Sequence, residues 1–311
     1  MYTKEFAKIR KSDSFMAGGK GASLGKMTQA RIPVPPGFVI LATAFDKFIL
    51  EGSIATIIGS TLRKVDSRQT KSVVVASKEI RQVIRRTKIP SEIQKAIQQQ
   101  VSKLGAHFLA VRSSATAEDG VDASWAGELE SYLNVTPQNV MAAVRNCWSS
   151  LFTPRAIFYR FEKKFQKRKV SVAVVVQTMI QSEVSGVAFT VHPVTKNRNH
   201  VVIEAGYGLG EAIVGGKITP DMFVVHKKSG NIIERRISEQ HMQIVRSGTG
   251  TKETKVPRQK IGLQKLSDAV VLRLAKLCLT IEQHYKKPQD IEWAFAKGKL
   301  CIVQSRPITT L

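Results

Sequence analysis

The sequence predicts a mixed fold of the α+β or α/β class, and of the two we expect α+β. The first observation is a set of amphipathic helical patterns in the first half of the chain, at 70–87, 91–104, 137–150 and 154–164. The second is a change of character at 170–185, after which β-branched residues predict short strands at 170–178, 186–190, 201–204 and 222–226. The third is a helix at 264–285, followed by two strands at 290–295 and 300–304.

The change of character also predicts two lobes, 1–178 and 179–311. A chain of 311 residues suits one large domain or two domains of medium size. Hydrophobic residues make up 43% and charged residues 23%, as is ordinary for a globular protein. A Gly/Thr/Lys-rich stretch at 247–255 reads as a loop between the elements of the second lobe.

Nothing in the sequence predicts secretion or a membrane. The longest strongly apolar stretch, 170–180, is about half the length that a membrane-spanning helix requires. The first residues lack the apolar segment of a signal peptide. The three cysteines show neither metal-ligand spacing nor a disulfide framework, which fits a reducing compartment, so we expect a cytoplasmic location.

The charge balance is unusual, with 48 Lys and Arg residues against 24 acidic residues and a formal net charge of +24. Such a surface attracts polyanions, including nucleotides, nucleic acid and acidic proteins. The sequence carries no zinc finger, no RNP-like aromatic motif and no basic zipper. A solvated basic surface is therefore the simpler interpretation, and nucleic-acid binding is a hypothesis without a motif.

Two segments carry cations in settings that suit phosphate. At 18–21 the sequence Gly-Gly-Lys-Gly allows a close backbone approach, next to a cation and a helix start. Lys20 is followed by Gly21 and not by Ser or Thr, so this is not a Walker A loop, and a plain turn before a helix is the simpler interpretation. Arg112 ends a predicted buried strand and precedes a run of hydroxyls, where its planar fork could bind phosphate or a structural carboxylate.

The last two predicted strands carry candidate metal ligands. Alternation places Gln304 and Arg306 on one face, and Glu292 joins them only in one register. A two-residue turn at 297–298 would place Glu292 opposite Val303, whereas a three-residue loop or a bulge would place it opposite Gln304. We expect the longer loop or a bulge, which would offer two oxygen ligands to Mg²⁺. A hairpin with exposed charges is the alternative.

These signals occur together in a recognisable order. The motifs are Gly-Gly-Lys-Gly-Ala-Ser-Leu-Gly at 18–25, Ile-Pro-Val-Pro-Pro-Gly-Phe-Val-Ile at 32–40, Ala-Val-Arg-Ser-Ser-Ala-Thr-Ala-Glu-Asp at 110–119, Asp-Ala-Ser-Trp-Ala-Gly at 122–127, Ser-Glu-Val-Ser-Gly-Val-Ala-Phe-Thr at 182–190, Gly-Leu-Gly-Glu-Ala-Ile-Val-Gly-Gly at 208–216, Asp-Ile-Glu-Trp at 290–293 and Gln-Ser-Arg-Pro-Ile-Thr at 304–309. The chain closely resembles the ATP-binding domain of the phosphoenolpyruvate synthase, pyruvate phosphate dikinase and rifampin phosphotransferase family. The resemblance implies an ATP-grasp fold that holds ATP between two lobes.

The resemblance also implies roles for individual residues. Lys20 and Arg112 would contact the phosphates, and Arg306 would clamp them, so that all three stabilise the transferred group. Glu292 and Gln304 would bind Mg²⁺. The remaining implied contacts, to adenine, to ribose and near the phosphates, come from Gln177, Met179, Ile180 and Glu183 at the adenine hinge, and from Gly127 and Ser131.

In the full-length family, a histidine on a swivelling domain accepts phosphate from ATP and passes it to pyruvate or a drug. No histidine here has the Ser-His neighbours of that domain, and neither it nor a pyruvate-binding barrel is visible in the sequence. The implied function is a kinase-type phosphotransferase component that needs a separate histidine-bearing domain or chain. The chain could be half of a split enzyme or a fragment. The alternative is a non-catalytic nucleotide-binding module recruited to an acidic partner or nucleic acid.

Overall fold

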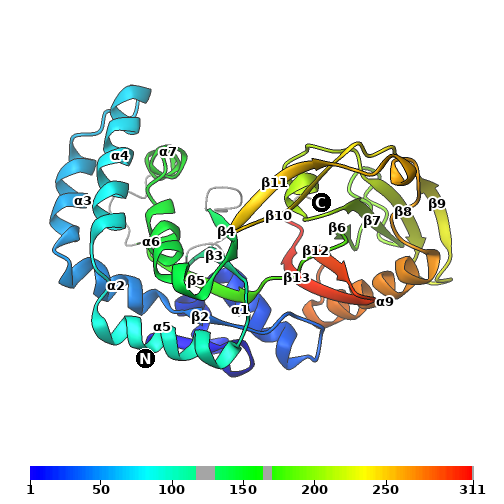
Figure 1. Ribbon diagram of the computed structural model, residues 1–311, viewed down its shortest axis with the longest axis horizontal. Coiled ribbons are helices and arrows are strands. Elements are labelled where there is room, and N and C mark those ends of the chain that lie inside the picture. Colours follow the sequence, from blue (N-terminus) through cyan, green and yellow to red (C-terminus); the bar gives the residue numbers. More distant parts are fainter. Residues whose placement is uncertain (117–129, 164–169, 310–311) are drawn as a thin grey trace. The chain divides into compact units, whose positions relative to one another are not determined.

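The computed structural model describes residues 1–116, 130–163 and 170–309, and it divides into two compact units (Figure 1). The first unit comprises Met1–Lys26 and Pro36–Met179, and the second comprises Met27–Pro35 and Ile180–Leu311. Both units combine helices with a sheet whose paired strands are antiparallel in the described residues. Antiparallel sheets with helices beside them agree with the α+β expectation.

The first unit is built on a five-stranded sheet in the order β1-β2-β5-β3-β4. Its strands are β1 (Thr3–Glu5), β2 (Gly37–Ile40), β3 (Leu109–Ala115), β4 (Ser131–Val135) and β5 (Val172–Thr178). Its helices are α1 (Ser14–Gln29), which begins in this unit, α2 (Ala42–Glu51), α3 (Ile54–Arg63), α4 (Thr70–Arg86), α5 (Ser91–Leu104), α6 (Val140–Ser150) and α7 (Pro154–Glu162). Short 3₁₀ turns lie at Phe6–Lys8, Lys11–Asp13 and Pro137–Asn139.

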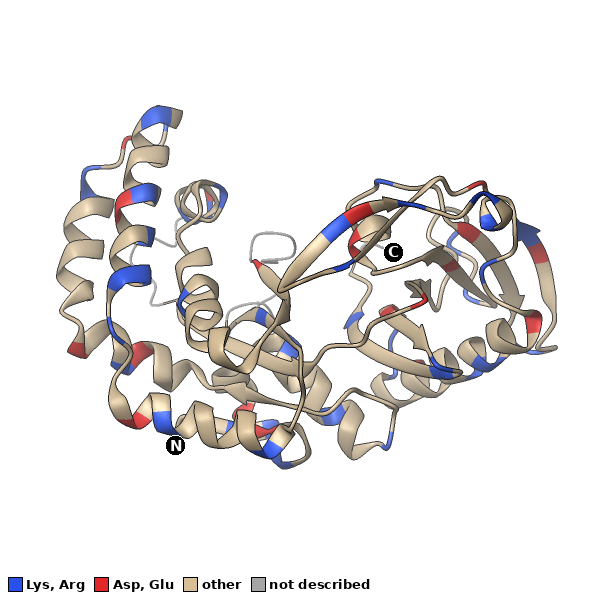
Figure 2. Ribbon diagram, viewed as in Figure 1, with Lys and Arg blue, Asp and Glu red and all other residues tan. Residues whose placement is uncertain are grey.

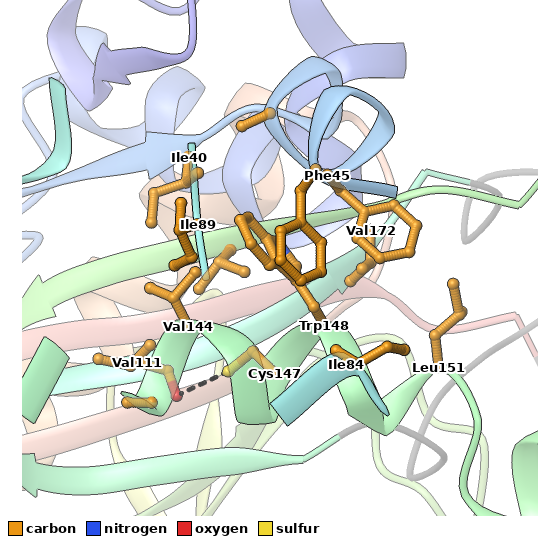
Figure 3. Packing of buried hydrophobic residues seen from close by; sticks show 14 of the residues in the cluster. Ile40, Phe45, Ile84, Ile89, Val111, Val144, Cys147, Trp148, Leu151 and Val172 are labelled. Carbon is orange, nitrogen blue, oxygen red and sulfur yellow. Dashed lines mark hydrogen bonds between the residues drawn. The ribbon is translucent and has the colours of Figure 1, made fainter. Parts of the chain in front are cut away.

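The main core of the first unit lies between this sheet and helices α2, α4 and α6 (Figure 3). Strand β5 is central, and its residues from Val172 to Gln177 are buried, which explains why four of these six residues are valine. Trp148 of α6 packs against Phe45 and Phe48 of α2, with ring centroids 6.0 and 4.7 Å apart. Helices therefore cover one face of the sheet closely.

The second unit is built on a six-stranded sheet in the order β13-β12-β6-β7-β8-β9. Its strands are β6 (Val184–Phe189), β7 (His200–Tyr207), β8 (Asp221–His226), β9 (Ile232–Arg236), β12 (Gln289–Ala296) and β13 (Lys299–Pro307). The other elements are helices α8 (Glu211–Val214) and α9 (Asp268–Tyr285), a 3₁₀ turn at Arg258–Lys260, and strands β10 (Met242–Ser247) and β11 (Gly250–Lys255).

Helix α9 packs against β12, β7 and β8, so that one face of the second sheet is covered by a helix. Its apolar stripe is Val271, Leu274, Cys278 and Ile281, all of them buried. Ile291, Ile203 and Phe223 lie in one cross-strand row and are buried as well. Because neighbouring residues of a strand point to opposite faces, the polar residues next to them in sequence lie on the face away from α9.

One expectation for a connecting segment is corrected by the structure. The stretch 247–255 is not a loop, because β10 and β11 pair from Met242↔Lys255 to Ser247↔Gly250 and leave only a two-residue turn. Buried Ile244 anchors this hairpin, while its other positions are largely exposed and polar, which hid the strand pattern in the sequence. The segment Met27–Pro35 belongs to the second unit, where the amide of Ile302 donates to the carbonyl of Pro33 at 2.8 Å.

No helix in the described residues has the length and apolarity needed to cross a bilayer. Lysine and arginine side chains are distributed over both units and outnumber the acidic ones (Figure 2). The basic character is therefore a property of both units.

A fully buried ion pair ties three segments of the second unit together. The Lys265 ammonium lies 2.8 Å from an Asp221 carboxylate oxygen, and both side chains are 0% exposed. Asp221 also accepts hydrogen bonds from the backbone amides of Ser238 and Lys265, at 3.0 and 2.8 Å. The ammonium also lies over the ring of Tyr207, 5.6 Å from its centroid. Burying two charges is costly, but here the carboxylate and the ammonium each have several partners.

We expect that removing one member of this pair will destabilise the protein far more than removing a surface pair. Asp221→Ala leaves a buried ammonium without its counter-ion, which should lower the free energy of unfolding by about 3–5 kcal/mol. Lys217→Met breaks the exposed pair with Glu253 and should cost less than about 1 kcal/mol. Urea denaturation measures both, and equal losses would contradict the structural role of the buried pair.

Candidate functional site

A kink in α1 fixes the position of Lys20. Gly18 has φ 67° and ψ 170° inside α1, and Lys20 lies in the first turn after it. A Cβ on Gly18 would lie 2.3 Å from the Ser114 hydroxyl oxygen and 2.6 Å from its carbonyl oxygen. Only glycine fits this left-handed, crowded position. The segment carrying Lys20 is therefore held against the end of β3.

Hydrogen bonds confirm this attachment of α1 to β3. The Ser114 hydroxyl accepts from the amide of Gly21 at 3.4 Å and donates to the carbonyl of Ala17 at 3.2 Å. Strand alternation places Ser114 on the same face of the sheet as Arg112. The kink of α1 thus lies over the sheet face on which the half-buried Arg112 is located.

The same sheet face carries two further residues that the resemblance singled out. Arg112 pairs directly with Ser131 on β4, and residues opposite each other across antiparallel strands share a face. Arg112 also lies opposite Val175, two positions before Gln177, which is 2% exposed. The first unit therefore brings the α1 kink, Arg112, Ser131 and Gln177 to one face.

Glu130, a residue that sequence reasoning missed, contacts β3 beside Arg112 through its backbone and α4 through its carboxylate. The Glu130 carbonyl accepts from the amide and the hydroxyl of Ser113, at 3.1 and 3.0 Å. Its carboxylate pairs with Arg81 at 2.5 Å and accepts the hydroxyl of Tyr132. Burial and this carboxylate raise the pKa of Tyr132. No sequence signal joins Arg81 to Glu130, because they are 49 positions apart.

Cys147 of α6 is a buried thiol next to the end of β3. Burial raises the pKa of the Cys147 thiol to about 12, and the positive charge of Lys20 opposes that shift. The Ser113 hydroxyl, next to Arg112 in sequence, lies 3.2 Å from the Cys147 carbonyl oxygen. The Ser113 hydroxyl therefore links the end of β3 to α6.

The residues of the implied adenine hinge are divided between the two units. Gln177 and Met179 belong to the first unit, whereas Ile180 and Glu183 belong to the second. The Met179 amide donates to the carbonyl of Phe108 at 3.0 Å, so the protein itself already engages that donor. The Glu183 carboxylate accepts from the amide of Lys297 at 2.9 Å. Gly127 lies outside the described residues.

In the second unit, a β-bulge brings Glu292 opposite Gln304. The turn at 297–298 has only two residues, with φ 50° at Lys297 and 75° at Gly298, and Ala296 pairs with Lys299. Trp293 pairs with Ile302 but Glu292 with Gln304, so Val303 is the extra residue. Of the two alternatives expected from the sequence, a longer loop or a bulge, the structure has the bulge. Glu292 is half-buried and Gln304 is 7% exposed.

Arg306 has a carboxylate partner that sequence reasoning did not assign. Its Nε and one terminal nitrogen lie 2.8 and 2.7 Å from the same oxygen of Asp290. Asp290 and Arg306 are also directly paired across the strands, so they share the face of Glu292 and Gln304. The Asp-x-Glu spacing at 290–292 was the available signal, because alternation puts both carboxylates on one side.

A further carboxylate, Glu204 on β7, lies in the same cross-strand row. Glu292 pairs with Val187 on β6, and Val187 pairs with Glu204. Burial raises the pKa of Glu204, and the negative charge of Asp290 adds to the shift. Within the described residues no set of three or more His, Cys, Asp and Glu side chains is arranged to hold a metal ion. A cation here would have few protein ligands.

Comparison with known proteins assigns this architecture to one group. The model of the "pyruvate phosphate dikinase, AMP/ATP-binding domain" family matches residues 15–311. A probable phosphoenolpyruvate synthase of Archaeoglobus fulgidus is 47% identical over 98% of this chain and 41% of its own length. The probable phosphoenolpyruvate synthase of Methanocaldococcus jannaschii is 44% identical over 97% of this chain and 26% of its own length. The rifampicin phosphotransferase of Bacillus subtilis is 39% identical over 97% of this chain and 35% of its own length. The chain therefore spans less than half the length of these relatives.

Alanine at Gly18 should be much more damaging than alanine at another glycine with positive φ. Gly105 has φ 61° but nothing within 4 Å of an added Cβ, so Gly105→Ala should cost only the backbone strain of about 1–2 kcal/mol. Gly18→Ala adds the clash with Ser114 and should cost at least about 1–3 kcal/mol more. Urea denaturation compares the two variants, and similar losses would show that α1 is not held against β3 as described.

Glu204 should make the protein less stable as the pH rises. Its folded pKa is raised above the ordinary value of 4.5, so above that value the unfolded chain loses the proton first. Stability contributed by the protonated form is then lost as the pH rises through the folded pKa. Glu204→Gln should therefore be more stable than the unchanged protein at pH 7 and no more stable at pH 4. Urea denaturation at both values checks this, with exposed Glu211→Gln as the control that should show no gain.

Proposed function

Since the chain belongs to the pyruvate phosphate dikinase AMP/ATP-binding domain family, we propose that it binds Mg-ATP and donates a phosphoryl group to a histidine on a separate domain or chain. The observation that carries the proposal is the pairing of Glu292 with Gln304, next to Arg306, on one face of the second sheet. Such a face offers two oxygen ligands and a cation in adjacent positions. Phosphoryl transfer needs this combination, since it is catalysed mainly by positioning and charge stabilisation.

We propose that Lys20 and Arg112 bind the phosphates from the first unit. The structure supports this proposal because Gly18 and Ser114 hold the Lys20 segment over the face of Arg112. Arg112 presents a planar fork of donors, and Lys20 a compact charge at a helix start. The positive charges of Lys20 and Arg112 would stabilise the transferred group most in the transition state, where negative charge develops on it. Ser131 shares the Arg112 face and would contact the nucleotide close to the phosphates, as would Gly127.

Mg²⁺ fits the proposed site. Magnesium prefers oxygen ligands, accepts few from the protein and keeps its remaining positions for water and phosphate oxygens. The Glu292 carboxylate and the Gln304 amide oxygen meet that preference, and the bulge at Val303 is what pairs them. When bound, the ion neutralises charge on the phosphates. Arg306 would contact the phosphate group, with Asp290 limiting the orientations of its guanidinium.

We propose that the chain has the ATP-grasp fold, with lobes 1–178 and 179–311, and that residues of both lobes bind the nucleotide. The adenine contacts would come from Gln177, Met179, Ile180 and Glu183, around the end of β5. Support comes from the order of motifs and from family membership over residues 15–311. Because the Met179 amide is engaged by Phe108, other backbone groups of this segment would have to read the base edge.

The acceptor would be supplied by another domain or chain. The relatives are much longer than this chain, and none of the six histidines here has the sequence neighbours of the family's phosphohistidine. We propose that pyruvate or another small molecule receives the phosphate in the end. A non-catalytic nucleotide-binding role is less favoured, because a scaffold would not need Lys20, Arg112 and Arg306 to be kept together with both metal ligands.

Incubation with Mg-ATP and a histidine domain from a relative tests the proposal. We expect AMP, inorganic phosphate and phosphohistidine to form from ATP and water, because one of the two phosphoryl groups goes to the histidine and the other is released. Lys20→Ala or Arg112→Ala should lower the rate about 10²–10³-fold, because each removes charge stabilisation from the transferred group. Lys26→Ala is the matched control, since Lys26 is exposed on the same helix and should be dispensable. ATP binding without transfer to any supplied histidine domain would instead support the non-catalytic role.

A further inference from the structure

Arg160 is a buried cation in the first unit that the proposed function does not use. It lies in the last turn of α7 and is 8% exposed. Within residues 1–116, 130–163 and 170–309, no carboxylate forms an ion pair with it, and its Nε is enclosed without a hydrogen bond. A buried arginine almost always has a carboxylate or another anion beside it, because an uncompensated charge in the interior is expensive.

The group stays charged at neutral pH despite this cost. Burial lowers the pKa of Arg160 only to about 10, which is still well above 7. The protein therefore carries a true guanidinium at this position. Since Arg160 is not neutralised by losing its proton, the cost of burying its charge has to be offset by neighbouring groups or by a bound anion.

The described neighbours compensate the charge only in part. The guanidinium lies over the ring of Phe152, 5.5 Å from its centroid, a contact worth up to about 2 kcal/mol when desolvated. The C-terminal end of α7 adds a favourable dipole of about 0.3–1 kcal/mol. Removing an isolated charge from water costs several kcal/mol even after relaxation, so a deficit remains.

Arg81 shows how the same fold satisfies a similar group. It lies on α4, which packs against α7, and the carbonyl of Phe152 accepts from Ser77, one turn before Arg81 (Figure 1). Its Nε is also enclosed without a hydrogen bond, but its terminal nitrogen pairs with Glu130 at 2.5 Å. Arg81 thus has the carboxylate that Arg160 lacks among the described residues.

We propose that Arg160 is the cation of a phosphate-binding position in the first unit, where a phosphate group supplies the negative charge that Glu130 supplies to Arg81. The planar donor fork of arginine matches two oxygens of such an anion. The phosphate could be free in solution or belong to a bound nucleotide, and the chemistry at Arg160 is the same. No bond is made or broken in this binding step.

Inorganic phosphate is the probe, used with the full chain in a chloride buffer without ATP. At about ten times its dissociation constant, phosphate should raise the melting temperature by about 2 °C, and Arg160→Met should abolish that rise. Without phosphate, Arg160→Met should melt no lower than the unchanged protein, because an apolar side chain of similar length replaces an uncompensated charge. Exposed Arg85→Met should leave both values unchanged.

A second arm distinguishes the two sources of phosphate. The measurement is repeated with a saturating non-hydrolysable ATP analogue. If the phosphate-dependent rise persists, the position is separate from the nucleotide. If the rise disappears and Arg160→Met weakens binding of the analogue tenfold or more, Arg160 binds a nucleotide phosphate. Both results support the proposal, and neither depends on phosphoryl transfer, so failure of the proposed function would be seen separately.

Two results would overturn the proposal. The first is that phosphate does not raise the melting temperature of the unchanged protein, or raises that of Arg160→Met by the same amount. The second result concerns Arg160→Lys, which is used if Arg160→Met does not fold. This variant keeps the charge but lacks the planar fork, so the proposal expects it to bind phosphate at least tenfold more weakly. Undiminished phosphate affinity in Arg160→Lys would mean that phosphate does not bind the planar fork of Arg160, and the proposal would fail.

Discussion

The pairing of β12 with β13 depends on one extra residue, and the candidate metal ligands depend on that pairing. With a two-residue turn at 297–298 and no bulge, Glu292 would lie opposite Val303, and Gln304 would face α9. The bulge at Val303 restores the match, so that an acidic and an amide oxygen are side by side. Trp293 and Ile302, on the turn side of the bulge, still direct their side chains into the core at 1% and 0% exposure. A single insertion thus satisfies both the core and the site.

The first unit solves a similar problem with a glycine in place of a bulge. Gly18 introduces a kink within α1, and the lack of a side chain lets the helix approach the backbone of β3. In both units the candidate side chains lie on the sheet face that is not filled by the main helical core. Glu130, Asp290 and Ser114 then hold those side chains or their strands in place through hydrogen bonds and ion pairs.

Local patterns in the sequence predicted the elements well where periodicity was strong. The helices at 91–104 and 264–285 and the final strand pair are examples. Face matching required either a longer loop or a bulge between the last two strands, and it could not choose between them. The hairpin β10–β11 was missed because its exposed positions carry Gly, Thr and Lys, which resemble a loop. Contacts between distant residues could not be predicted. Arg81 with Glu130, Asp221 with Lys265 and Pro33 with Ile302 are set by packing, and nothing local records them.

The division of the chain into units has a consequence for dissecting it. The backbone passes between the units at 26/27, at 35/36 and at 179/180, and the middle piece contributes Pro33 as a hydrogen-bond acceptor for Ile302. A protease cut at one crossing would leave the units joined by the others. A gene fragment starting at Ile180 would expose an unsatisfied amide on β13, the strand that bears Gln304 and Arg306. Permuted or spliced versions that retain 27–35 are therefore the rational way to isolate this half.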